Sequence, residues 1–155
     1  MEFNYNNTMI QIPEKLGGWI VQKVIPLDYI DSDYVKNHRR LQVFAIKGIE
    51  CSVRDCPCKG AFFIERVDTN KKGEPKGVHV DLYTEDFQLM TVDHHIAKSK
   101  GGNDTIENKF PMCAHHNTKK GRLDPEVFYS RFGVAKQGNV PDESLLKKYE
   151  YSRLK

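Results

Sequence analysis

The sequence predicts an α+β fold, in one compact domain whose strands are flanked by helices near both ends of the chain. Two observations support this class. Stretches rich in β-branched and aromatic residues, at residues 60–67 and 78–83, have the composition or the alternation of strands. Helix-capping signals stand on either side of them, at Asp33 and at Asp124-Pro125. A length of 155 residues suits one domain with a terminal extension.

The N-terminal part is expected to be an extension, residues 1–47, that contains a tail and a helix. Residues 1–15 are polar and rich in Asn, which predicts a poorly tethered tail. Residues 16–24 predict a short strand or docking segment. Asp33 is a plausible N-cap for a helix over residues 34–46, and the glycine at position 48 would end it.

The middle of the chain predicts strands. Residues 60–67 are rich in Phe and Ile and indicate a strand, and residues 68–77 indicate a turn or loop. Residues 78–83 alternate apolar and polar side chains, and a second short strand is expected at residues 89–92. A short turn that includes residues 84–87 separates these last two strands, so we expect them to pair as a hairpin.

The C-terminal part predicts an ordered loop and then helices. Residues 96–109 contain a Gly-Gly-Asn-Asp run and are expected to form the loop. Residues 113–120 indicate a short helix that the next glycine ends, and Asp124-Pro125 begins another. A final helix is expected at residues 142–154. We expect residues 123–155 to form a helical segment that packs on a core made of residues 48–122.

Composition excludes a membrane-spanning role and gives a default compartment. The longest apolar runs are a few residues, well short of the roughly 18 to 20 that a membrane-spanning helix needs. The first residues have neither the basic start nor the apolar stretch of a secretory signal, so we expect the protein in the cytoplasm.

The formal charge of +3 is informative only once it is located. The whole excess falls between Asp93 and Arg122, because basic and acidic residues balance in the rest of the chain. A local basic excess favours a face that binds a polyanion, although a solvated lysine-rich loop would have the same composition. The basic residues of this window are Lys98, Lys100, Lys109, Lys119, Lys120 and Arg122.

The cysteines indicate a metal site. Nothing points to export, and Cys/His clusters of cytosolic proteins more often bind metal than form disulfides. Structural zinc takes about four thiolate or imidazole ligands, usually as two close pairs. Cys51 with Cys56, or Cys56 with Cys58, could be the first pair, and Cys113 with His116 the second. Ordinary buried or free thiols are the alternative.

Three polar clusters surround the predicted loop. Asp93-His94-His95 follows a strand, Asn108 lies near the end of the loop, and His115-His116-Asn117 lies on the next helix. An imidazole can accept a proton from water, and a carboxylate can hold a divalent cation that polarises a phosphate oxygen. Neighbouring strand residues point to opposite faces, so only one of His94 and His95 can enter an active groove. A zinc bound by both pairs would clamp the two ends of this unit.

The motifs with these residues resemble the signature of HNH endonucleases. The resemblance rests on residues 89–102, on Glu107-Asn108 and on residues 112–121, and it covers roughly residues 48–122. It is closest to the zinc-containing, phage-type members. This implies a ββα-metal core held together by a structural zinc, with flanking N- and C-terminal helices.

The resemblance also implies a role for each motif residue. His94 corresponds to the general base that activates water, and Asp93 and Asn117 to the ligands of a catalytic divalent cation, Mg²⁺ or Mn²⁺. Asn108 corresponds to an asparagine that braces the loop. In the structural zinc site, the matching residues are Cys51, Cys56, Cys113 and His116. The first cysteine pair is spaced two residues wider than usual, so Cys58 could replace Cys56.

The expected reaction is hydrolysis of DNA phosphodiester bonds, as nicking or double-strand cleavage. Basic residues would hold phosphates and give binding that weakens with salt. The expected contacts are Lys98, Lys100, Lys119, Lys120, Arg122, Arg39 and Arg40. Two alternatives stay open: a zinc-knuckle module that binds nucleic acid without cutting it, and a resolvase of branched DNA acting as a homodimer. If the chain is phage-encoded, the compartment would be the bacterial host cell. The sequence predicts neither a recognition site nor a biological role.

Overall fold

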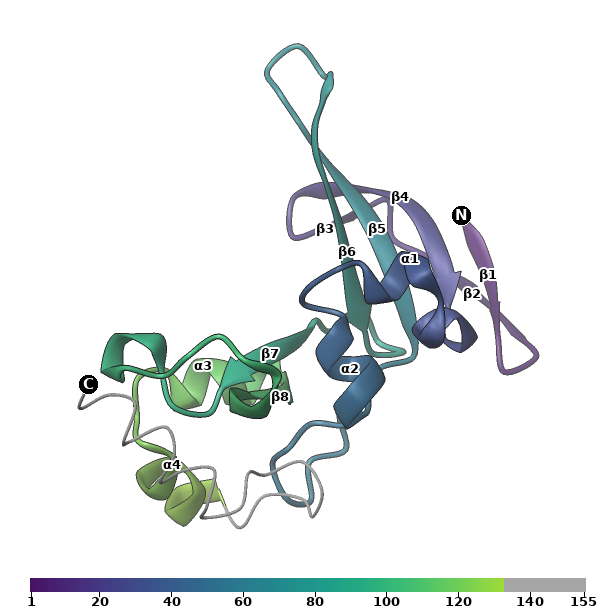
Figure 1. The fold of residues 1–155 in the computed structure, drawn as a ribbon. Helices are drawn as coiled ribbons and strands as arrows, with labels where there is room; N and C mark the ends of the chain where they lie inside the picture. Colours follow the sequence, from purple (N-terminus) through teal and green to yellow (C-terminus); the bar gives the residue numbers. More distant parts are fainter. Residues whose placement is uncertain (133–155) are drawn as a thin grey trace.

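The computed structural model describes residues 1–132, which fold around a four-stranded antiparallel sheet (Figure 1). Its strand order is β3-β4-β5-β6. The strands are β3 (Lys15–Leu16), β4 (Trp19–Pro26), β5 (Phe62–Thr69) and β6 (Pro75–Tyr83). β4 pairs with β5, so the sheet crosses the expected boundary after residue 47. Residues on both sides of that boundary therefore contribute strands to one sheet.

The expected N-terminal tail is an ordered hairpin. It consists of β1 (Glu2–Tyr5) and β2 (Thr8–Gln11), which pair antiparallel. Asn6 and Asn7 make the turn with φ angles of 50° and 62°, a region that asparagine enters more readily than most residues. The rings of Phe3 and Tyr5 pack edge-on against Phe62, with centroids 5.6 Å and 5.7 Å away. The prediction of a loose tail was wrong because the Asn-Asn turn was not recognised.

The helix expected at residues 34–46 is two short helices, α1 (Asp33–Lys36) and α2 (Gln42–Lys47). Ser32, and not Asp33, is the N-cap, because its side chain accepts a hydrogen bond from the backbone N–H of Val35. On one continuous helix of about 3.6 residues per turn, Val35 and Phe44 would lie on opposite faces. Both are buried in the same core, so the chain must turn between them. Gly48, with a φ of 95°, ends α2 as expected.

The expected hairpin of residues 78–83 with 89–92 does not form. β6 pairs with β5, and an isolated bridge between Tyr83 and Leu89 joins it to the next strand. That strand, β7 (Met90–His94), pairs instead with β8 (Lys109–Cys113), which follows the intervening loop. The sequence does not indicate β8, because Pro111 lies at its centre and proline cannot donate to a ladder.

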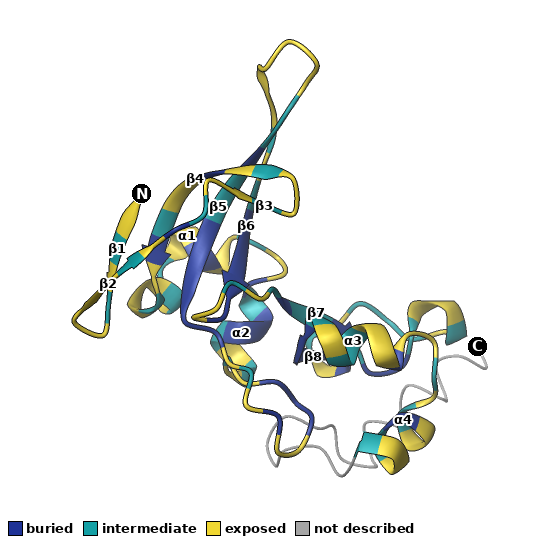
Figure 2. Ribbon diagram, turned by 180° about the vertical axis from the view of Figure 1, so that it is seen from behind, coloured by how far each residue is buried: buried dark blue, intermediate teal, exposed yellow. Residues whose placement is uncertain are grey.

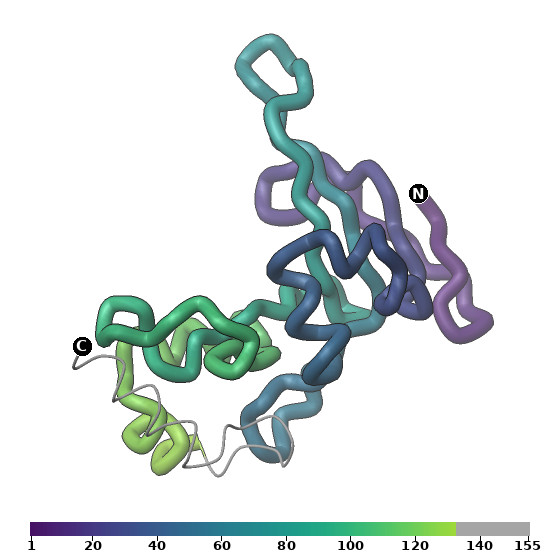
Figure 3. Tube along the Cα trace, in the orientation of Figure 1, coloured from purple at the N-terminus to yellow at the C-terminus, as the bar shows by residue number. Residues whose placement is uncertain are grey.

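β7, β8 and the helices that follow form a second unit beside the sheet. β8 runs directly into α3 (Ala114–Lys120), and α4 (Pro125–Phe132) follows. Both helices confirm the sequence prediction, including Gly121 at the end of α3 and Pro125 at the start of α4. The trace in Figure 3 shows this green unit beside the sheet, with α2 where the two meet. The helix expected at residues 142–154 lies outside the described residues. Among the described residues, no helix has both the length and the apolar character needed to cross a bilayer.

Two apolar clusters lie on the two faces of the sheet, and Figure 2 shows β5 and β6 among the most buried segments. On one face, Phe62 and Ile64 pack under the N-terminal hairpin. On the other face, Phe63 joins Phe44 of α2 and a core that continues to β7, β8 and α4. This shared core fixes the β7–β8–α3 unit relative to the sheet.

Candidate active site and metal centre

Two polar pairs join β7 to α3. Asn117 Nδ2 donates a hydrogen bond of 2.7 Å to Thr91 Oγ1. Lys120 Nζ lies 3.2 Å from Asp93 Oδ1 and 3.1 Å from Oδ2. Alternate residues of a strand share a face, and so do residues three apart on a helix. The Thr91–Asn117 and Asp93–Lys120 contacts are therefore neighbours in one strand–helix interface.

Lys120 is a structural residue of this interface. Its side chain is fully buried, and Nζ also donates to the backbone oxygens of His94 and His95 at 3.0 Å each. The expectation that Lys120 contacts phosphate was wrong, because α3 turns this lysine inward onto the end of β7. Its neighbour Lys119 is exposed.

Asp93 and Asn117 present oxygen atoms suited to a divalent cation. Burial raises the pKa of the Asp93 carboxyl, and the ammonium of Lys120 opposes that rise. Oδ2 of Asp93 is buried, and its one close partner among the described residues is the ammonium of Lys120, an ion-pair contact of 3.1 Å. Because the amide nitrogen of Asn117 donates to Thr91, its Oδ1 is the atom left to bind a ligand. Carboxylate and amide oxygens are ligands that Mg²⁺ and Mn²⁺ favour, so the donor types of this pair suit such an ion. The ion would share the Asp93 carboxylate with the ammonium of Lys120, which lies against both of its oxygens.

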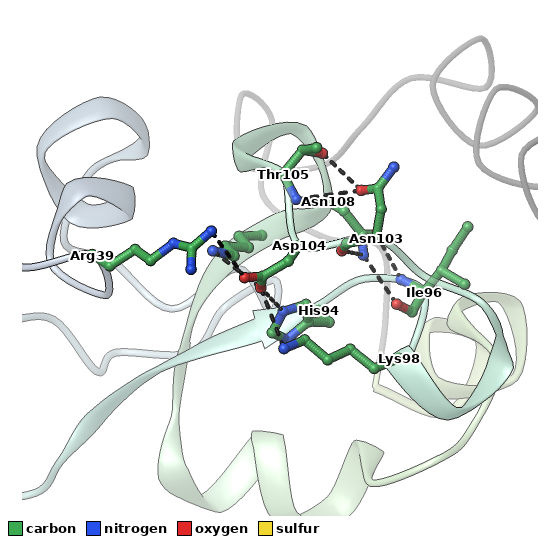
Figure 4. Close-up of polar contacts among 9 residues, drawn as sticks. Arg39, His94, Ile96, Lys98, Asn103, Asp104, Thr105 and Asn108 are labelled. Carbon is green, nitrogen blue, oxygen red and sulfur yellow. Dashed lines mark hydrogen bonds and ion pairs between the residues drawn. The ribbon is translucent and has the colours of Figure 1, made fainter.

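His94 ends β7 and lines a cleft of about 390 Å³. Its side chain is a quarter exposed, and Nε2 lies 2.8 Å from Asp104 Oδ1. Lys109, Lys98 and Arg39 surround the same carboxylate at 3.2, 3.5 and 3.6 Å, as Figure 4 shows for the labelled residues. The hydrogen bond from His94, and then that from Lys109, hold the pKa of Asp104 far below its usual range.

Asn108 braces the loop between β7 and β8. Its buried side chain accepts from the N–H of Ile96 at 2.9 Å and donates to the oxygens of Ile96 and Asn103 at 3.0 and 2.8 Å. Gly102 packs against the same backbone, where an added Cβ would clash with the oxygen of Ile96. The loop therefore folds back on itself, which places Asp104 next to His94.

His95 lies on the other side of the strand, in the core. Its ring stacks on Tyr129 and meets Phe110 edge-on, with centroids 5.9 and 5.6 Å away. Neither ring nitrogen has a hydrogen-bonding partner among the described residues. Burial lowers the pKa of His95 to about 4, so the ring is neutral near pH 7. Of the two neighbouring histidines, His94 alone lines the cleft.

The seven basic residues expected to hold phosphate are not all together. Arg39 and Arg40, on the turn between α1 and α2, line the same cleft as His94 and Lys98. Arg40 also pairs with Asp81 at 3.3 Å. Lys100 pairs with Asp124 at 2.9 Å, and Lys119 and Arg122 are exposed around the end of α3.

Cys51, Cys56, Cys113 and His116 form a second centre, with their ligand atoms all within 4.8 Å of one another. Nδ1 of His116 lies 3.3 Å from Cys113 Sγ and 3.7 Å from Cys51 Sγ, and Cys56 Sγ lies 3.9 Å from Cys113 Sγ. Tetrahedral ligands at zinc distances lie roughly 3.5–3.8 Å apart, which fits this group. Cys58 is not one of these four, but its thiol lies within hydrogen-bonding reach of those of Cys56 and Cys113, and its backbone oxygen accepts from the N–H of Cys51 at 3.0 Å.

Sequence reasoning missed three residues of the site. Asp104 and Lys109 contact each other beside His94, and Thr91 orients Asn117. Lys109 lies opposite His94 in the β7–β8 register, a pairing that the sequence does not indicate because β8 itself is not predicted. Asp104 gave no periodic signal, because it lies in an irregular loop.

The comparisons with known proteins agree with this geometry. No curated protein and no solved structure matches the chain. The family model for HNH endonuclease matches residues 77–123. The matched span runs from β6 to the end of α3 and includes His94, Asn108 and Asn117. This chain therefore contains an HNH endonuclease domain, and residues 77–123 belong to the HNH endonuclease family.

Proposed function

We propose that the protein is a metal-dependent endonuclease that hydrolyses DNA phosphodiester bonds, with His94 as general base. The observation that carries this proposal is the position of His94 in a cleft lined by Arg39 and Lys98, at the end of the strand that bears Asp93. Membership of the HNH family supports a nuclease, and the basic lining supports a polyanionic substrate.

In the proposed reaction, the imidazole of His94 removes a proton from a water molecule, and the resulting hydroxide attacks phosphorus in line with the departing 3′ oxygen. Asp93 and Asn117 would hold a divalent cation, Mg²⁺ or Mn²⁺, that stabilises negative charge on the phosphorane and the leaving oxygen. Arg39 and Lys98 would hold the flanking phosphates. These contacts carry little base information, so they support binding more than sequence choice.

We also propose that Cys51, Cys56, Cys113 and His116 bind one structural zinc. The distances between their ligand atoms support zinc, and so does the mixture of three thiolates and one imidazole. The cluster joins the loop before β5 to the start of α3. Zinc would therefore fix the helix that carries Asn117 without taking part in the chemistry.

Plasmid relaxation tests the activity. We expect the wild-type protein, purified with its zinc, to convert supercoiled DNA to nicked or linear forms with added Mg²⁺ or Mn²⁺. Without an added divalent ion, and with trace ions removed by a chelator too weak to extract the zinc, we expect no cleavage. A protein that binds DNA but leaves the plasmid intact under all these conditions would contradict the proposal and support a non-catalytic binding module. A matching assay on linear and four-way DNA would reveal a preference for branched substrates.

A further inference from the structure

We propose that Asp104 is the residue that orients His94, by accepting the Nε2–H of the imidazole so that Nδ1 is the nitrogen that takes the proton from water. This inference rests on the proposed function of His94. Asp104 is a positioning residue in this scheme, because it acts on the substrate only through the histidine.

The loop holds the Asp104 carboxylate in place from several sides. Asn108 donates to the backbone oxygen of Asn103, the residue before Asp104, at 2.8 Å. Thr105, the residue after it, donates from Oγ1 to Asn103 Oδ1 at 2.7 Å (Figure 4). The backbone around Asp104 is thus fixed by the same asparagine that closes the loop.

Lys109 fixes the carboxylate from the opposite strand. His94 and Lys109 are register partners of β7 and β8, and Asp104 bridges them with contacts of 2.8 and 3.2 Å. The Lys109 side chain is 9% exposed, whereas those of Lys98 and Arg39 are 62% and 79% exposed. The two exposed cations are free to move onto DNA, so Lys109 is the counter-ion that would stay with Asp104 when substrate binds.

The chemistry of the contact selects one tautomer of His94. An ionised carboxylate only accepts hydrogen bonds, so the ring nitrogen beside it must carry the proton. In the neutral ring, the other nitrogen, Nδ1, then has the lone pair. An Asn at position 104 could either accept from Nε2–H or donate to a bare Nε2, so it would no longer select one tautomer.

Nitrogen-15 NMR of the zinc-loaded protein without DNA tests the tautomer directly. At a pH where the imidazoles are neutral, we expect His94 to be protonated at Nε2. In Asp104→Asn, we expect a measurable population protonated at Nδ1. The matched control is Asp124→Asn, which alters the neighbouring Lys100–Asp124 pair and should leave the His94 signals unchanged. A His94 tautomer that is the same in wild type and Asp104→Asn would overturn the proposal.

Single-turnover cleavage gives a second, separate test. We expect Asp104→Asn to lower the rate at saturating DNA by about 10- to 100-fold, as loss of an orienting partner typically does, with DNA affinity changed less than the rate. Asp124→Asn should cleave like wild type. A normal rate for Asp104→Asn, or a defect confined to affinity, would sink the proposal. If wild type itself does not cleave DNA, the proposed function fails, while the NMR comparison still decides whether Asp104 sets the tautomer.

Discussion

Asn108 is the residue on which the loop of the site depends most. Replacing it with alanine leaves the buried N–H and oxygen of Ile96, and the partly buried oxygen of Asn103, without their partner. We expect Asn108→Ala to lower the free energy of unfolding by about 1–3 kcal/mol for each group left unpaired and buried, and to slow cleavage. Asn108→Asp keeps the acceptor for Ile96 but turns an oxygen toward two carbonyl oxygens, so it should be no milder. Urea denaturation measures the free energy of unfolding of both variants. If Asn108→Asp lowered it only slightly, lost side-chain volume and not lost hydrogen bonds would explain the effect of Asn108→Ala.

His95 gives the protein a dependence of stability on pH. Its pKa is lowered to about 4 by burial, against about 6.5 in the unfolded chain. Between these values the unfolded state binds a proton that the folded state does not, so stability should fall as pH drops from about 6.5 to 4. By linkage, the loss is at most about 3 kcal/mol.

His95→Phe removes this titration and fills the same apolar site between Phe110 and Tyr129. Denaturation at pH 7 and pH 5 should show a smaller loss for the variant than for wild type. Other titrating groups, the zinc ligands included, are the same in both proteins, so their contribution cancels in the difference. Equal losses in the two proteins would contradict the assignment to His95.

At the scale of single residues, the sequence motifs predict which residues belong to the site but not the residues that contact them. Asn108 braces the loop as the family resemblance implied, and His94 faces the cleft. Asp104 could not be foreseen, because its contact with His94 depends on how an irregular loop closes. Lys120 looked like surface charge, since no local pattern shows which face of a seven-residue helix is buried.

Among the elements, the loop that carries the first cysteine pair, Cys51 and Cys56, gives the sharpest test of the metal centre. We expect Cys56→Ser to lose bound zinc and to unfold at a lower temperature than wild type, because a structural site needs all four ligands. Cys58→Ser is the matched comparison, since Cys58 borders the cluster without being one of its four grouped ligands, and it should keep one zinc per chain. Metal analysis and thermal denaturation measure both variants. Zinc lost from Cys58→Ser and kept by Cys56→Ser would reverse the assignment.

The helices after β8 were predicted well because capping signals are local, at Gly121 and Pro125. Strand pairing was predicted poorly because it is not local. The short turn after β6 suggested a hairpin with β7, yet β7 pairs with β8 across a loop that contains the active-site brace. Contacts that are distant in sequence also explain why the helix expected at residues 34–46 is two helices, α1 and α2. The chain turns between them so that both Val35 and Phe44 are buried in one core.

On the scale of the whole molecule, the N-terminal elements complete the cleft that contains His94. The turn between α1 and α2 brings Arg39 to the cleft that contains His94, although the two are far apart in sequence. We expect Arg39→Ala to weaken DNA binding and to reduce the slope of log affinity against log salt by about 1, as loss of one phosphate contact does. Arg54→Ala removes an exposed arginine from the loop before β5 and serves as the control. Binding titrations over a range of salt would contradict this role if Arg39→Ala kept the wild-type slope.

The central claim is that His94 activates water in a cation-dependent cleavage of DNA. Single-turnover cleavage of a labelled duplex by wild type and His94→Ala, over a range of Mg²⁺ concentrations, tests it most directly. The account predicts that the wild-type rate rises with Mg²⁺ to a plateau, and that His94→Ala, folded and with its zinc, stays at background at every concentration. A folded, zinc-loaded His94→Ala protein that cleaves at the wild-type rate would contradict it.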